Sequence, residues 1–280
     1  MTAPERWTSV VTQSVTIGDV SLAYRRLGPT GGVPVMLLNH WGANLDNFDP
    51  AIVEGLAADR PVYALDYRGI GASGGAAPRT IAGTATDIIA AIHALAAGPV
   101  DVIGFSFGGF VAQQILLDAP DLVRRAILAG TGPAGGAGIA RVGAVSWPLI
   151  LKGLMTFRDP KTYLFFTGSA KSRRAAADFL RRLKLRIAQR DKAVGMPAFL
   201  AQLAAIKAWG LQPAQPLDGV RTPVLVVNGD HDIMVPSENS RDLARRISGA
   251  GLILYPDAGH GGIFQYHDQF LATAKAFLVA

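Results

Sequence analysis

Cysteine is absent from this chain of 280 residues. Without thiols the protein cannot build a disulfide framework, a thiolate nucleophile or a cysteine-based zinc site. A chain of this length buries roughly 75% of its unfolded surface, so it needs neither a disulfide nor a metal to hold its core. The absence of cysteine is also compatible with the cytoplasm, which is the location we expect.

Targeting and membrane signals are lacking as well. Residues 1–7 show no basic start followed by an apolar stretch, so we expect no signal peptide. No run of about 18 apolar residues occurs, and we therefore expect no membrane span.

Acidic residues are scarce in one part of the chain. The net charge is +6, but residues 141–195 hold 13 Lys or Arg and only 3 Asp, a net of +10, which leaves −4 for the remainder. This uneven distribution does not describe a uniformly basic nucleic-acid binder, so we expect no nucleic-acid partner. The basic stretch has three interpretations: an arginine that binds a substrate carboxylate or phosphate, a contact with an anionic partner, or a solvated helix face.

Apolar runs of strand length alternate with helical stretches through the first half of the chain. This alternation predicts an α/β fold with a mostly parallel sheet that is flanked by helices on both faces. The expected buried strands are 33–38, 61–65, 100–103 and 123–129, the expected helices 84–97 and 108–118, and the expected opening hairpin 10–16 with 20–25.

The alternation then stops. From 139 to 210 no run has the length and apolar character of a buried strand. A stripe of helical spacing is present instead, formed by Ala176, Phe179, Leu180, Leu183 and Ile187. We interpret residues 132–212 as a helical cap, or lid, inserted between a first core part, 1–131, and a second core part, 213–280.

A glycine-flanked serine follows the strand expected at 100–103. The stretch Gly104-Phe105-Ser106-Phe107-Gly108-Gly109 has the pattern of a nucleophile elbow, a sharp turn between a strand and a helix. Small neighbours are needed because the turn is tight. The backbone N–H of Phe107, at the start of the helix, can then point at a developing oxyanion.

Candidates for an acid and a base follow the serine along the chain, in the order Ser, Asp, His that accompanies a nucleophile elbow. Asp230 and Asp232 come directly after the apolar run 224–227, and His260 comes after the apolar run 252–255. The carboxyl ends of parallel strands meet at one edge of a sheet. We therefore expect these side chains to lie near Ser106.

Three further motifs accompany this pattern. Residues 66–73 read Asp-Tyr-Arg-Gly-Ile-Gly-Ala-Ser, residues 229–236 contain Gly-x-x-Asp-x-x-Val-Pro, and residues 258–261 read Ala-Gly-His-Gly. With them the chain resembles the α/β-hydrolase-fold serine hydrolases, and within that superfamily the small bacterial esterases and cofactor-free haloperoxidase-like (perhydrolase) enzymes. The resemblance covers roughly 33–131 and 212–278.

The resemblance implies a catalytic triad. Ser106 would be the nucleophile and His260 the base that takes its proton. Asp232 would hold the imidazole in the required tautomer, because family spacing favours it over Asp230. Asp230 would then order the loop or pair with a cation.

The oxyanion hole needs a second backbone donor besides Phe107, from the loop after the first buried strand. The family usually has His-Gly-aromatic there, whereas in this chain Trp41 directly follows His40. Counting back from Phe48 places Trp41 at the donor position. Gly42 is the alternative donor.

Together these features predict a serine hydrolase that cleaves a small to medium carboxylic ester or lactone through an acyl-enzyme intermediate. We expect a small-molecule substrate, no cofactor, no metal, and a monomer or homodimer. Perhydrolysis of the haloperoxidase-like kind and hydrolysis of carbon–carbon bonds could use the same residues. An alternative of another class is a ligand-binding sensor on this fold.

Overall fold

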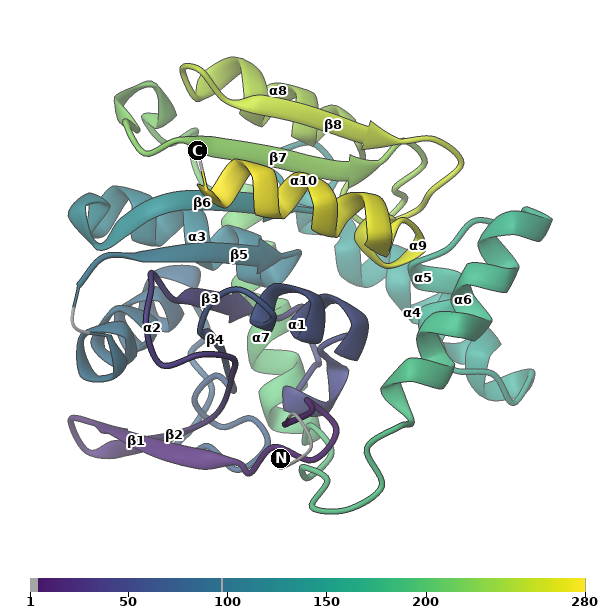
Figure 1. Cartoon of the computed structure of the whole chain (residues 1–280). Coiled ribbons are helices and arrows are strands. Elements are labelled where there is room, and N and C mark those ends of the chain that lie inside the picture. The colour runs from purple at the N-terminus through teal and green to yellow at the C-terminus, as the bar shows by residue number, and fades with distance from the viewer. Residues whose placement is uncertain (1–4, 97, 280) are drawn as a thin grey trace.

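The computed structural model describes residues 5–96 and 98–279. Its centre is one sheet of eight strands in the order β1-β2-β4-β3-β5-β6-β7-β8 (Figure 1). The pairs β1–β2 and β2–β4 are antiparallel, and every other neighbouring pair is parallel. The strands are β1 (Gln13–Ile17), β2 (Val20–Leu27), β3 (Val35–Leu38), β4 (Val62–Leu65), β5 (Val100–Phe105), β6 (Val123–Ala129), β7 (Val224–Gly229) and β8 (Gly251–Tyr255).

Helices cover both faces of this sheet. In Figure 1, α1 and α10 lie in front of the strands, whereas α2, α3 and α8 lie behind them. The mostly parallel, helix-flanked sheet that the sequence predicts is thereby confirmed. The helices are α1 (Pro50–Ala57), α2 (Ile81–Leu95), α3 (Phe107–Asp118), α8 (Glu238–Arg246), α9 (Gly262–Gln265) and α10 (His267–Val279).

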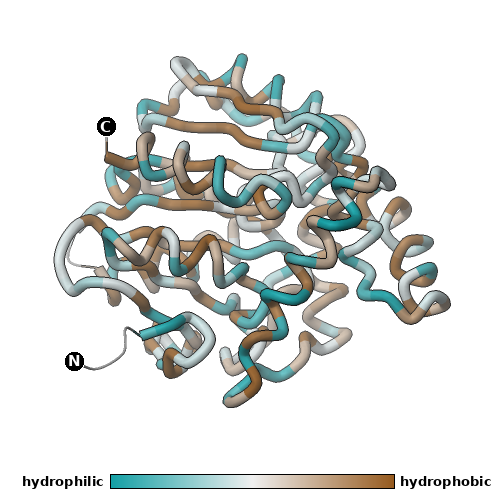
Figure 2. Tube along the Cα trace, turned by 45° about the vertical axis from the view of Figure 1, so that its right-hand side comes forward, coloured by the Kyte–Doolittle hydropathy of each residue, from teal (hydrophilic) through white to brown (hydrophobic). Residues whose placement is uncertain are grey.

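The central strands are apolar because helices cover them on both faces. Every residue of β5 and β7 is buried, and Figure 2 shows hydrophobic colour running along the strands of the sheet. Local signals set the helix starts. Thr80 caps α2 by accepting a hydrogen bond from the backbone N–H of Gly83, which starts this helix three residues before the expected Thr84.

Between β6 and β7 the chain leaves the sheet and forms helices only, within the described residues; we call residues 132–212 the cap segment. In Figure 1 the helices within 142–183 lie beyond the carboxyl ends of the parallel strands, whereas the helix at 196–211 is seen behind the sheet. The division of the chain at 131 and 212 remains our prediction. The elements of the cap segment are η3 (Ile139–Arg141), α4 (Val142–Met155), α5 (Lys161–Leu164), α6 (Ala170–Leu183) and α7 (Met196–Leu211).

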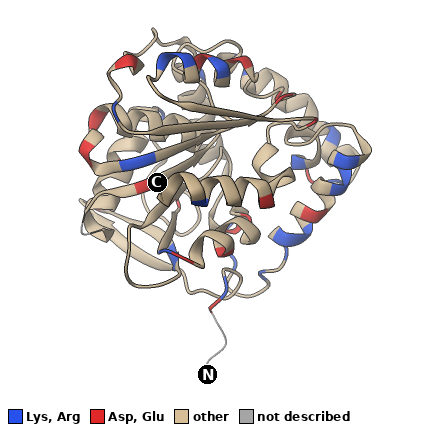
Figure 3. Cartoon of the chain, turned by 45° about the horizontal axis from the view of Figure 1, so that its top comes forward, with Lys and Arg blue, Asp and Glu red and all other residues tan. Residues whose placement is uncertain are grey.

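The predicted apolar stripe of the cap segment is correct at one end and wrong at the other. Ala176, Phe179 and Leu183 are buried on α6. Ile187 is 88% exposed, because α6 ends at Leu183 and the helical period no longer applies beyond it. The basic residues of this region are visible as blue segments at the right of Figure 3. In the part of the chain described here, no helix has both the length and the hydrophobicity for crossing a bilayer.

Candidate active site

Ser106 occupies a strained turn between β5 and α3. Its backbone has φ 55° and ψ −112°, a region that residues other than glycine rarely adopt. The neighbouring glycines make the turn possible. A Cβ on Gly104 would lie 2.3 Å from the carbonyl oxygen of Gly108, and one on Gly108 would lie 2.1 Å from the carbonyl oxygen of Leu38. The sequence therefore folds here into a turn that presents the serine side chain at the carboxyl edge of the sheet.

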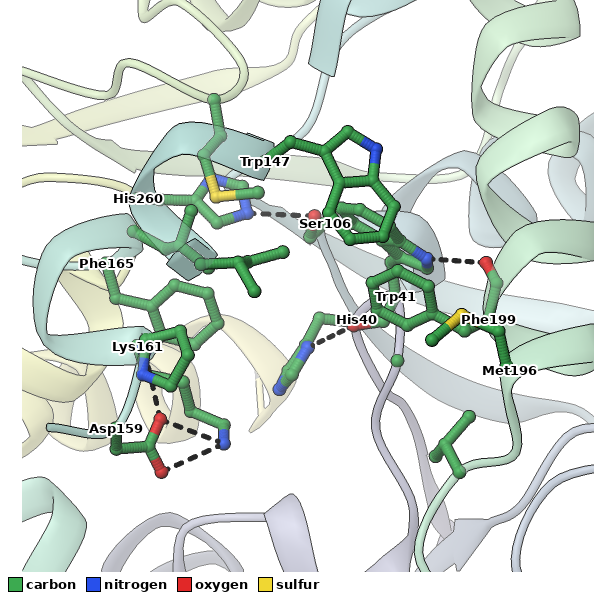
Figure 4. Close-up of a pocket in the computed structure, with 16 residues that line it drawn as sticks. His40, Trp41, Ser106, Trp147, Asp159, Lys161, Phe165, Met196, Phe199 and His260 are labelled. Atoms are coloured by element: carbon green, nitrogen blue, oxygen red, sulfur yellow. Dashed lines mark hydrogen bonds and ion pairs between the residues drawn. The ribbon is translucent and has the colours of Figure 1, made fainter. Parts of the chain in front are cut away.

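Ser106, His260 and Asp232 lie in one hydrogen-bonded row. Ser106 Oγ is 2.8 Å from His260 Nε2, as the dashed line in Figure 4 marks. His260 Nδ1 is 2.7 Å from Asp232 Oδ2. The imidazole is 1% exposed. A carboxylate opposite Nδ1 requires a proton on that nitrogen, which leaves Nε2 as an acceptor for the serine hydroxyl. This arrangement can raise the nucleophilicity of the serine oxygen.

The carboxylate of Asp232 is itself held in place. Its Oδ1 accepts hydrogen bonds from the backbone N–H groups of Met234 and Val235, at 2.8 and 3.0 Å. Its Oδ2 is thus left for His260. The loop after β7 therefore fixes the direction from which the carboxylate approaches the imidazole.

Asp230 faces a different partner. Its Oδ1 lies 2.5 Å from His231 Nδ1 and accepts a 3.3 Å hydrogen bond from the backbone N–H of Ala258. The hydrogen bond to Asp230 raises the pKa of His231 above its usual value. Asp230 makes no hydrogen bond to His260 within residues 5–96 and 98–279.

The loop after β3 contains both candidates for the second oxyanion donor. The backbone N–H of Gly42 donates to Gln202 Oε1 at 2.9 Å and is therefore occupied. The backbone N–H groups of Trp41 and Phe107 have no acceptor among the described residues. Two unpaired N–H groups beside the serine are what a developing oxyanion needs. This pattern favours Trp41 over Gly42.

Helix α7 of the cap segment holds this loop. Besides the contact from Gln202 to Gly42, the indole Nε1 of Trp41 donates to the carbonyl oxygen of Phe199 at 2.8 Å (Figure 4). The rings of Trp41 and Phe199 lie 4.3 Å apart between centroids. The sequence did not point to Gln202 or Phe199, because the periodicity of a helix does not tell which distant loop it contacts.

His40 is buried and neutral. Its Nδ1 lies 2.8 Å from the carbonyl oxygen of Trp41, so Nδ1 carries the proton. Burial lowers the pKa of His40 to about 3, and the positive charge of Lys161 lowers it further in the same direction. Its Nε2 has no hydrogen-bond partner in the described structure.

A pocket of about 310 Å³ opens above Ser106 and His260. Most of its wall is aromatic or aliphatic, as Figure 4 shows. Lys161 also reaches it and lies 3.4 Å from a carboxylate oxygen of Asp159. Such a pocket suits a largely apolar molecule with few polar groups. Its wall includes Trp41, Trp147, Ile150, Leu164, Phe165, Val194, Met196, Phe199 and Met234.

Two arginines of the cap segment bind residues of the first core part rather than this pocket. Arg182 forms two hydrogen bonds with Asp49, at 2.8 and 2.6 Å. Arg186 donates to the backbone carbonyl oxygens of Trp7 and Val10, at 3.1 and 3.0 Å. None of the described arginines lines the pocket, so of the three interpretations of the basic stretch, an arginine that binds a substrate anion is not supported here. The described residues also contain no group of three His, Asp or Glu side chains placed to hold a metal ion.

Comparisons with known proteins agree with this geometry. A family model described as alpha/beta hydrolase fold matches residues 33–265. The chain is 32% identical to a poly(3-hydroxyalkanoate) depolymerase of Ectopseudomonas oleovorans, over 81% of this chain and 77% of that protein. It is 28% identical to a pimeloyl-[acyl-carrier protein] methyl ester esterase of Neisseria meningitidis, over 91% and 96%. A solved alpha/beta hydrolase fold protein from Chitinophaga pinensis superposes with a TM-score of 0.91 at 33% identity, over 98% and 99% of the two chains.

Proposed function

Because the chain belongs to the alpha/beta hydrolase fold family, we propose that it is a serine hydrolase that cleaves small to medium carboxylic esters or lactones. One observation carries this proposal: Ser106, His260 and Asp232 form a hydrogen-bonded row at the floor of an apolar pocket. A serine hydroxyl with an imidazole nitrogen at 2.8 Å has the base that it needs to attack a carbonyl carbon.

In the first half of the reaction Ser106 becomes acylated. His260 Nε2 takes the hydroxyl proton as the serine oxygen bonds to the ester carbonyl carbon. The carbonyl oxygen gains negative charge, which the N–H groups of Phe107 and Trp41 stabilise. The alkoxide then leaves with the proton from His260, and the acyl group remains on the serine. Asp232 stabilises the transient imidazolium without taking its proton.

In the second half water removes the acyl group. His260 takes a proton from a water molecule, whose oxygen attacks the acyl carbon. The serine leaves with that proton, and the products are a carboxylic acid and an alcohol. A lactone would give both groups in one hydroxy acid. No step of this route calls for a cofactor.

The pocket supports an apolar substrate of modest size. Its volume of about 310 Å³ and its aromatic walls favour short or medium acyl and alcohol groups. The names of two relatives, a poly(3-hydroxyalkanoate) depolymerase and a methyl ester esterase, also support an ester as the substrate. We therefore expect esters and lactones to be better substrates than amides.

A substrate panel tests the proposal. Acid release from alkyl esters, lactones and amides is followed by titration, with wild type and the Ser106→Ala variant in parallel. We expect multiple turnovers on at least one ester or lactone and none with the variant. Peracid formation with added peroxide as the dominant reaction would assign perhydrolysis instead. A single turnover followed by tight retention of the product would assign a sensor.

A further inference from the structure

Helix α4 of the cap segment carries an apolar face outward. Leu151 follows Trp147 by four residues, and Leu154 and Met155 follow Leu151 by three and four. The four side chains are 42%, 56%, 65% and 72% exposed, in the order Trp147, Leu151, Leu154 and Met155. A helix on the surface of a soluble protein normally shows polar residues at those positions. This stripe therefore lacks the partner that its composition calls for.

Phe157 extends the stripe beyond the end of α4. Its side chain is 98% exposed, and its backbone has φ 53°, which is rare for a bulky residue. The turn is held by the backbone N–H of Arg158, which donates to the carbonyl oxygen of Gly153 at 2.9 Å. The turn after α4 thus holds the phenyl ring of Phe157 in solvent.

The apolar surface continues from α4 to α7 and reaches the mouth of the pocket. The ring of Trp147 lies 5.8 Å from that of Phe199, and the nearby Met196 and Leu200 are 58% and 45% exposed. Trp147 and Met196 also line the pocket above Ser106. We call this surface the cap face; it consists of Trp147, Leu151, Leu154, Met155, Phe157, Met196 and Leu200.

Positive charge flanks the cap face on one side. Lys152, Arg158 and Arg173 line one hollow of about 410 Å³ beside α4. Within the described residues none of the three forms an ion pair with a carboxylate. Lys152 lies over the ring of Tyr163, 4.6 Å from its centroid, and Arg173 donates to the carbonyl oxygen of Gly168, so no carboxylate of the described chain neutralises their charges. Apolar side chains with such cations near them match a lipid surface, which has an apolar interior and anionic headgroups.

We propose that the cap face docks on an anionic lipid surface. Helix α4 lies along the interface with Phe157 inserted among acyl chains, and Lys152, Arg158 and Arg173 meet the headgroup phosphates. The pocket mouth then opens toward the lipid, from which an apolar molecule can enter. A second copy of the chain fits less well, because a two-fold contact of this face would bring the two basic flanks together.

Vesicle sedimentation tests this docking. Ser106→Ala protein is mixed with vesicles of phosphatidylcholine alone or of phosphatidylcholine and phosphatidylglycerol in equal parts. We expect binding to the mixed vesicles and at least about tenfold weaker binding to the neutral ones or in high salt. The experiment measures how much Ser106→Ala protein sediments with the vesicles. Because this variant lacks the proposed nucleophile, the result does not depend on the proposed hydrolysis.

Matched variants separate the two contributions. Met155→Ser with Phe157→Ser removes apolar contact, and Lys152→Gln with Arg158→Gln and Arg173→Gln removes charge. Each set should weaken vesicle binding by at least about tenfold. A control with three exposed cations on α8 replaced, Arg241→Gln with Arg245→Gln and Arg246→Gln, should bind like the parent protein.

Three results would overturn the docking. They are no sedimentation with either vesicle, equal sedimentation with both, or unchanged binding in both sets of variants. A concentration-dependent dimer in analytical ultracentrifugation that Phe157→Ser abolishes would assign the cap face to a second copy instead. Folding is checked by circular dichroism, and hydrolysis of a soluble short ester should be unchanged in Met155→Ser with Phe157→Ser, since neither residue lines the pocket.

Discussion

The two aspartates after β7 have neighbouring positions but different partners. Asp232 contacts the imidazole of His260 at 2.7 Å, whereas Asp230 contacts His231. We expect Asp232→Asn to lower kcat by about 10⁴-fold, because an amide favours the wrong imidazole tautomer. We expect Asp230→Asn to change kcat by no more than a few fold. Steady-state kinetics on one ester compares the two.

The same experiment needs a control for folding, since Asp232 also accepts hydrogen bonds from Met234 and Val235. An asparagine side chain keeps one carbonyl oxygen for these contacts. Unfolding midpoints in urea should therefore be similar for the two variants. If Asp230→Asn were the more damaging change at equal stability, the assignment of the acid would be reversed.

His40 makes a prediction about stability in acid. Its pKa is about 3 in the folded protein, against 6.5 for an ordinary histidine, mainly because it is buried. Between those values the unfolded chain binds a proton that the folded protein does not bind. The free energy of unfolding therefore decreases as the pH falls from about 6.5 to 3, by about 1.4 kcal/mol per pH unit from this residue at most.

The variant His40→Asn isolates this contribution. An asparagine amide keeps a donor for the carbonyl oxygen of Trp41 and removes the titrating ring. Urea unfolding at a series of pH values should give a shallower acid dependence for the variant, by about one proton. Parallel curves for the two proteins would show that His40 is not kept neutral by the fold.

Strands and helices were predictable where the signal is local. The strand β6 begins and ends where the apolar run 123–129 does, and the elbow motif places the start of α3. The apolar stripe was expected to reach Ile187, but α6 ends at Leu183. A periodic pattern does not show where a helix ends. Ser106 and His260 could be named because each follows its own strand, whereas the choice of Asp232 over Asp230 came from the spacing of the family that the chain resembles.

Contacts between the cap segment and the core could not be predicted from the sequence. Gln202 and Gly42 are separated by 160 residues, and no pattern in either segment points to the other. The basic stretch did not reveal that Arg182 binds Asp49 or that Lys161 is the cation at the pocket. These pairings depend on how helices pack in three dimensions, which single-sequence periodicity does not specify.

Helix α7 holds the loop that carries the proposed oxyanion donor Trp41, so we expect it to affect the reaction through this loop. We expect Gln202→Met to lower kcat by about 10- to 100-fold, because the loss of the contact to Gly42 lets the Trp41 N–H shift. KM should change little, since Gln202 does not line the pocket. Pre-steady-state kinetics separates acylation from the later step.

Two further variants decide whether this effect is one of position. Gln202→Glu keeps an acceptor for the Gly42 N–H, and the amide nitrogen that it replaces has no partner among the described residues. It should restore much of kcat. The control is Gln114→Leu. Gln114 lies on α3 and its side chain donates to Asp118 Oδ1 at 2.9 Å, so this variant should retain full kcat. A loss of stability without a change in kcat in Gln202→Met would contradict the positioning role.

Buried ion pairs join distant parts of the chain. Arg25 on β2 is fully buried and contacts Asp46 at 2.9 Å and Asp191 at 2.7 Å. Arg25→Met would leave the buried Asp191 without its ion pair, and Asp46 with only the more distant Arg190 and Arg186, at 3.3 and 3.7 Å. We therefore expect a loss of about 3–5 kcal/mol in the free energy of unfolding. Urea denaturation measures it. Adding Asp46→Asn and Asp191→Asn should recover part of the loss, and a change below about 1 kcal/mol for Arg25→Met would contradict the importance of this cluster.

The chemistry proposed for the protein rests on a covalent intermediate at Ser106. Rapid mixing of the enzyme with p-nitrophenyl acetate or butyrate measures it most directly, with the Ser106→Ala variant in parallel. We expect a burst of p-nitrophenol close to the enzyme concentration, then steady turnover, and neither phase with the folded variant. Turnover that survives in Ser106→Ala, or folded wild-type protein with no burst and no turnover, would contradict the acyl-enzyme mechanism.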